Sequence, residues 1–145
     1  MTRLVAALLT ATLALSPVPA AAQGAGLSKD TRQKLLTALD RASAWVRSQQ
    51  KPTGVFEDHL GITGITTTAL LKLPKPARDQ ASASALKALD YIRAQAKPDG
   101  GIYEKAIPHY MTAVSMMALN AGGLAPDRAL VTKGRAPWHP TRERS

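Results

Sequence analysis

The sequence of 145 residues predicts an all-α protein made of tandem helical hairpins. Apolar residues recur at intervals of three and four over long stretches, which is the pattern of helices that bury one face. Prolines and glycines separate those stretches, as they do at helix ends. In addition, one pattern of helix end, Gly-containing turn and second helix occurs twice, which indicates a repeat architecture.

The two copies of this pattern are 46 residues apart, from Trp45 to Tyr91 (91 − 45 = 46). Four segments match in the same order, namely 45–49 with 91–95, 51–54 with 97–100, 55–57 with 102–104, and 68–70 with 112–114. The third match requires one additional residue in the second copy, and the fourth requires the spacing to change in the opposite direction. A two-helix unit of about 40–47 residues is typical of several helical solenoids.

The first hairpin is predicted over about 28–73. Ser28 is a suitable N-cap for its first helix, and the residue before Pro52 is pushed out of the helical region, which ends that helix. The apolar stripe of this helix consists of Leu35, Leu36, Leu39, Ala42, Trp45 and Val46. The second helix is expected over about 65–73, although its β-branched run at 66–68 leaves a strand as the alternative.

The second hairpin is predicted over about 77–121. Its first helix, over about 77–96, has an apolar stripe and a charged face, so it is expected to be an amphipathic outer helix. Its second helix, over about 110–121, is apolar on nearly all sides, which is typical of a buried helix. Gly122 and Gly123 end it. Each repeat therefore pairs an outer helix with a more apolar inner helix.

Residues 1–22 have the pattern of a secretory signal peptide. Arg3 gives a positive start, an apolar run follows over 4–15, and three alanines at 20–22 offer a cleavage site before Gln23. A membrane anchor is the alternative, but the apolar run is shorter than the roughly 20 residues that a spanning helix needs. We therefore expect a periplasmic or secreted protein with no stable membrane span after cleavage.

Charge and composition exclude several classes of function. The net charge is +9, but the basic residues of 23–123 alternate with acidic ones along the helices, which is typical of a solvated face and not of a nucleic-acid interface. The chain has no cysteine, so no thiolate can act as nucleophile or metal ligand. The segment 124–145 is rich in proline and arginine and is expected to be a disordered basic tail.

The repeat pattern resembles the repeats of the prenyltransferase and squalene-hopene cyclase (terpenoid cyclase) superfamily, and most closely the exported bacterial prenyltransferase/squalene-oxidase repeat proteins. The resemblance covers about 35–123. It lies in Trp45, Gln49, Gly54 and Phe56 of the first copy and in Tyr91, Gln95, Asp99, Gly100, Gly101, Tyr103, Tyr110, Thr112 and Ala113 of the second.

This resemblance implies an α/α toroid whose inner helices line a central cavity, of which two hairpins make only a part. It also implies the chemistries of the superfamily, but their residues are missing here. The cyclases protonate a polyprenyl chain with an Asp-rich motif, and this chain has no Asp-x-Asp-Asp cluster. The protein prenyltransferases bind zinc through Asp, Cys and His, and this chain has no Cys. No catalytic residue, cofactor or metal is therefore assigned.

The candidate site consists of polar residues in the two loops that follow the Gly turns. If the hairpins stack side by side, these residues lie on one rim, at the mouth of any cavity. They are Glu57, Asp58, His59, Glu104, His109 and Tyr110. Two histidines with carboxylates could bind a metal or provide a general base, but loop polar groups more often cap the local backbone.

The other repeat residues are expected to be structural. Asp99, Gly100 and Gly101 suit a turn, because Gly permits positive φ and Asp accepts hydrogen bonds from the turn backbone. Gln49 and Gln95, at helix ends, are expected to bond to neighbouring backbone or to neighbouring repeats. Trp45 and Tyr91 are expected to pack between helices.

Two functions follow from this reading. The first is an exported, non-catalytic binding or scaffold module that binds a protein partner or associates with itself. The alternative is a partial terpenoid-cyclase-like enzyme, an isomerase or lyase that acts on an isoprenoid in an apolar cavity. Since repeat arrays generally need about three units, we expect either self-association or a chain that is part of a longer toroid.

Overall fold

The computed structural model describes residues 26–105 and 107–135, and it confirms the all-α class. Within those residues it contains five helices: α1 (Lys29–Ser48), α2 (Leu60–Leu71), α3 (Ala77–Ala94), α4 (Pro108–Gly122) and α5 (Asp127–Gly134). The expected signal peptide at 1–22 lies outside the described residues. The described part has no strand, and an isolated bridge joins Ala96 to Ile102.

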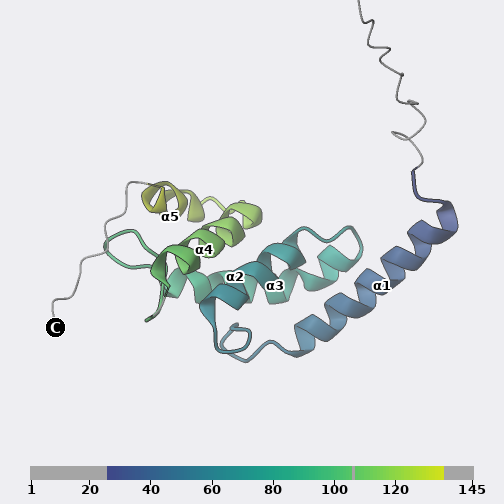
Figure 1. The fold of residues 1–145 in the computed structure, drawn as a ribbon, viewed down its shortest axis with the longest axis horizontal. Helices are drawn as coiled ribbons and strands as arrows, with labels where there is room; N and C mark the ends of the chain where they lie inside the picture. Colours follow the sequence, from purple (N-terminus) through teal and green to yellow (C-terminus); the bar gives the residue numbers. More distant parts are fainter. Residues whose placement is uncertain (1–25, 106, 136–145) are drawn as a thin grey trace, which may run out of the picture.

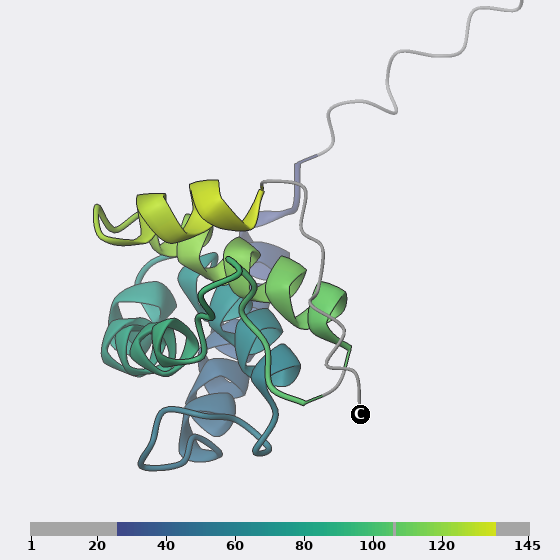
Figure 2. The ribbon, with the colours of Figure 1, turned by 90° about the vertical axis from the view of Figure 1, so that its left-hand side faces the viewer.

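The helices form an inner and an outer row (Figures 1 and 2). The inner helices α2 and α4 pack against each other, and this is the most extensive helix contact in the fold. The outer helices α3 and α5 pack on α2 and α4 respectively, while α1 packs on α3. Figure 1 shows α1 extending away from the other helices, so much of its surface faces solvent.

The core lies between the inner and outer rows in two clusters. The larger one joins α2, α3, α4 and α5 and contains Leu60, Leu89, Ile92, Ile102, Met111, Ala118, Leu119 and Val131. The smaller one lies between α2 and α3 and contains Phe56, Leu70, Ala81, Ala85 and Ala88. Its three alanines let α3 approach α2 closely, because they present only a methyl group.

The first helix begins where the sequence predicts. The Ser28 hydroxyl accepts a hydrogen bond from the Thr31 N–H at 3.1 Å, as an N-cap does. By contrast, α2 begins five residues before the expected start, because His59 acts as its N-cap. The His59 Nδ1 accepts from the N–H groups of Gly61 and Ile62 at 3.1 and 3.3 Å. Histidine is an uncommon cap, which is why the sequence did not indicate this start.

The β-branched run of α2 is helical, and the strand alternative is wrong. The Thr67 hydroxyl donates to the Thr63 carbonyl at 2.6 Å, and the Thr68 hydroxyl donates to the Gly64 carbonyl at 2.8 Å. These threonines therefore satisfy their own polar atoms within the preceding turn, so they can line a buried helix.

Hydrogen bonds correct the alignment of the two repeats. The Lys51 N–H donates to Val55 at 3.0 Å, and the Lys97 N–H donates to Gly101 at 2.8 Å. The spacing of 46 therefore continues without slack, and the expected match of 55–57 with 102–104 is wrong by one residue.

The inner helices have a different spacing from the rest of the repeat. The Thr63 hydroxyl accepts from the Phe56 N–H, and the Thr112 hydroxyl accepts from the Ile102 N–H, both at 3.0 Å. The equivalent of Thr112 is thus Thr63, at a spacing of 49 (112 − 63 = 49), and not the Thr68 expected from sequence. The second loop contains the three additional residues.

The segment after α4 is not wholly a disordered tail, because α5 occupies Asp127–Gly134. Asp127 and Val131 are buried against the core. The backbone of Lys133 lies against Gly100 as that of Lys87 lies against Gly54, again at a spacing of 46 (133 − 87 = 46). The outer helix of a third repeat therefore begins in this segment. Residues 136–145 of the expected tail lie outside the described residues.

The inner helix α4 is less buried than its composition predicts. Met111, Val114, Ala118 and Leu119 are buried, but Met117 is 57% exposed. An all-round apolar sequence therefore has one face in the core and another at the surface. No described helix is long and apolar enough to span a membrane.

Candidate functional site

The first rim loop has an unusual backbone. Glu57 and Asp58 have φ values of 52° and 48°, in the left-handed region that non-glycine residues seldom adopt. The loop closes through a hydrogen bond from the His59 N–H to the Phe56 carbonyl at 3.1 Å. The Asp58 carboxylate forms an ion pair with Lys51, at the surface. These contacts order the loop with its acidic side chains in solvent.

His59 is committed to the backbone of α2. Since its Nδ1 accepts two backbone N–H groups, that nitrogen carries no proton, and the neutral ring is protonated on Nε2. The same nitrogen cannot then serve as a general base. His59 is therefore a capping residue, which agrees with the alternative that loop polar groups cap the local backbone.

The second rim loop is tied to α3 by Tyr91. The Tyr91 hydroxyl donates to Glu104 Oε1 at 2.7 Å. Burial raises the pKa of Tyr91 to about 12, with further contributions from the hydrogen bond and charge of Glu104 and from the charge of Asp58. Since Asp58 also acts on this phenol, the first loop lies near the second.

Tyr110 brings the loops together from the start of α4. Its ring and the His59 ring flank the same point of α2, because a Cβ added to Gly61 would lie 2.8 Å from Tyr110 Cε1 and 3.1 Å from His59 Cε1. His109 is exposed on the first turn of α4, after Ile107, whose φ is 46°. His59 and Tyr110 therefore lie close together beside Gly61.

Within 26–105 and 107–135, no group of three or more His, Asp or Glu side chains is placed to hold a metal ion. The metal-binding alternative raised by the two histidines and the carboxylates is therefore not supported by the geometry of these residues.

The turn residues behave as the sequence predicts. The Asp99 carboxylate accepts from the Gly101 N–H and from the Tyr103 hydroxyl, both at 2.8 Å. Gly100 has a φ of 91°. Phe56 and Ile102 are buried at equivalent places after the two Gly turns. These residues are structural.

Two expectations about the repeat residues are wrong. Trp45 is 66% exposed and does not pack between described helices. The glutamine that links neighbouring repeats is Gln50, whereas the Gln49 side chain donates to the hydroxyl of its own neighbour Ser48 at 3.0 Å. The Gln50 amide donates to the carbonyls of Gly54 and Ser84 at 2.9 and 3.0 Å.

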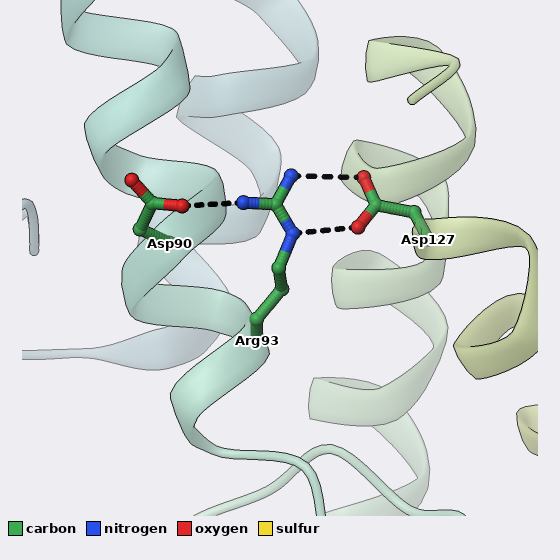
Figure 3. A network of polar contacts seen from close by, with 3 residues as sticks. All are labelled: Asp90, Arg93 and Asp127. Atoms are coloured by element: carbon green, nitrogen blue, oxygen red, sulfur yellow. Dashed lines mark hydrogen bonds and ion pairs between the residues drawn. The ribbon is translucent and has the colours of Figure 1, made fainter. Parts of the chain in front are cut away.

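An ion pair that the sequence did not predict links α3 to α5 (Figure 3). Arg93 Nε and Nη2 donate to the two carboxylate oxygens of Asp127 at 2.6 and 3.1 Å, and Asp90 lies on the other side of the guanidinium. Asp127 is only 2% exposed. This fork-to-fork geometry is the strong form of an Arg–carboxylate contact, and it explains how a short helix is held in place.

The apolar hollows lie away from the rim. One, of about 240 Å³, lies between α1 and α2, and we name it the N-terminal groove. It is lined by Leu39, Ala42, Ser43, Val46, Ile65, Thr66, Ala69, Leu70 and Leu73. A second, of about 330 Å³, lies between α4 and α5 and is lined by both apolar and charged residues, including Leu119, Val131, Arg128 and Arg135.

Comparisons with known proteins yield no relative. No family model, curated protein or solved structure gives a significant match to the chain.

Proposed function

We propose that this chain is an exported, non-catalytic helical-repeat module that binds another polypeptide through apolar helix faces. The observation that carries the proposal is a contrast between two surfaces: the polar rim residues are engaged in local contacts, whereas apolar side chains on the inner helices α2 and α4 are exposed. At the rim, His59 caps a helix and Glu104 accepts from Tyr91. At the ends of the inner row, large apolar side chains such as Ile65 and Met117 are exposed.

This contrast favours binding over catalysis for a physical reason. A general base needs a free lone pair within reach of substrate, whereas the His59 lone pair is used by the backbone. Exposed apolar residues gathered on a face, on the other hand, are typical of protein interaction sites. The resemblance to prenyltransferase and squalene-cyclase repeats supports the same architecture, because such repeats bury their inner helices against further repeats.

A labelled helical peptide tests the proposal. The probe is residues 108–122 of the chain itself, which supplies an apolar helix of the kind that α2 and α3 already contact. Fluorescence anisotropy should show saturable binding to the protein. A peptide of the same composition in scrambled order, without the apolar face, should bind at least about tenfold more weakly, which corresponds to about 1.4 kcal/mol.

The same preparation tests the enzymatic alternative. Incubation with squalene and with farnesol, followed by gas chromatography, should show no new product. Product formation, or equal binding of the ordered and scrambled peptides, would overturn the proposal.

Export is a separate part of the proposal. It rests on the signal-like pattern of 1–22 and predicts a mature chain that begins at Gln23 in the periplasm or medium. Intact-mass measurement of the protein from cell fractions tests it. A chain that keeps residues 1–22 and stays with the cytoplasmic fraction would contradict export.

A further inference from the structure

We propose that the N-terminal groove is the docking surface for a second copy of this chain, with the two α2 helices facing each other across a two-fold axis. This inference rests on the proposed function and names the partner. It follows from comparing exposed positions on the first hairpin with their buried equivalents on the second.

The partly exposed apolar face of α1 corresponds to the buried face of α3. At the spacing of 46, the pairs are Leu35 with Ala81, Leu39 with Ala85, Ala42 with Ala88, and Val46 with Ile92. All four α3 residues are 0% exposed, because that face packs against α2 and the rest of the core. Leu35, by contrast, is 45% exposed. The α1 face therefore has the composition of a surface that an inner helix covers.

The exposed face of α2 has the same relation to α4. At the spacing of 49, Ile62 and Ile65 correspond to Met111 and Val114. The two α4 residues are buried, and the Val114 backbone lies against Gly64 of α2. Ile62 and Ile65 are 41% and 50% exposed. The groove between α1 and α2 is thus the open counterpart of a contact that the chain already makes internally.

The fold favours one arrangement of the second copy. Insertion of a partner's α4 would continue the array, but the partner's α5 would then occupy the outer position that α1 holds. In the proposed arrangement the partner instead presents its own α1–α2 face. The same face then meets itself around a two-fold axis, which is the commonest symmetry of soluble dimers.

The chemistry of the surface suits this contact. The α1 residues that line the groove are Leu39, Ala42, Ser43 and Val46, and none is charged. Trp45 follows Ala42 by one helical turn and adds a large exposed ring at the edge. Interface cores are depleted of charge and enriched in aromatic anchors, so Trp45 fits the role of an anchor.

Light scattering on the purified exported protein across a range of concentrations tests the proposal. We expect a dimer that dissociates on dilution, with a blue shift of Trp45 emission in the dimer, measured in a Trp138→Phe background. Because each copy contributes the substituted residue to a two-fold interface, Ile65→Glu buries two charges there. The dissociation constant of the dimer should therefore rise at least about 100-fold. Trp45→Ser, at an even more exposed position, should weaken it in the same direction.

Leu86→Glu is the matched control, because Leu86 is a comparably exposed leucine on α3, outside the groove. The dissociation constant of the Leu86→Glu dimer should be within about twofold of that of the unchanged protein. A monomer at all concentrations would overturn the dimer, although the same monomer could still bind the helical probe and so leave the proposed function standing. Equal weakening by Ile65→Glu and Leu86→Glu would also overturn it.

Discussion

Gly54 offers a direct test of how neighbouring repeats dock. It has a φ of 94°, and a Cβ built on it would lie 2.4 Å from the carbonyl oxygen of Lys87 and 2.9 Å from its carbonyl carbon. Gly54→Ala therefore meets two penalties. The left-handed backbone costs a residue with a Cβ about 1–2 kcal/mol. The clash is with backbone, which cannot rotate away, and overpacking of this kind costs about 1–3 kcal/mol.

The combined loss in the free energy of unfolding should be about 3 kcal/mol, within the ranges of those two terms. Urea denaturation followed by circular dichroism measures it. In a thermal melt the same loss should lower Tm by about 12–20 °C for a domain of this size. Protein concentration is kept constant between variants, because self-association would add to the apparent stability.

Two further glycines separate the penalties. Gly123 has a φ of 64° with nothing within 4 Å of an added Cβ, so Gly123→Ala should cost only about 1 kcal/mol. Gly100 has a φ of 91°, and its added Cβ would lie 3.2 Å from the Lys133 carbonyl oxygen, so Gly100→Ala should fall between the other two. If Gly54→Ala and Gly123→Ala cost the same, the close approach of the first loop to α3 is not part of the native state.

Three other perturbations test separate contacts. Asp127→Ala leaves a half-buried guanidinium without its main partner and should cost about 2–4 kcal/mol by urea denaturation, whereas no loss would show that α5 is not docked by this ion pair. Gln50→Ala should cost about 1–2 kcal/mol and Gln49→Ala less than about 0.5, and the reverse order would restore the assignment made from sequence. Tyr91 should titrate near pH 12 by absorbance at 295 nm, and Glu104→Gln should lower that value because it removes the charge that opposes ionisation. Because the folded pKa of Tyr91 exceeds the unfolded value of about 10, its contribution to stability is complete below pH 10 and declines as the pH rises towards 12.

The sequence by itself determined the helical class and most of the helix ends. These are local properties, because a cap such as Ser28 or a glycine such as Gly123 acts on the adjacent turn. The turn at Asp99 was also predictable, since its carboxylate bonds within four residues along the chain.

Only the tertiary structure decided the rest, because those features depend on contacts between distant segments. The helix α5 is short and has few apolar positions, and it is held by Asp127 on Arg93, 34 residues away along the chain. The inter-repeat role of Gln50 depends on Ser84, at the same separation. The exposure of Trp45 follows from the absence of a helix packed on that side of α1 within the described part of the chain. A local pattern records that a face is apolar, but only the packing of the helices shows whether the chain covers that face itself.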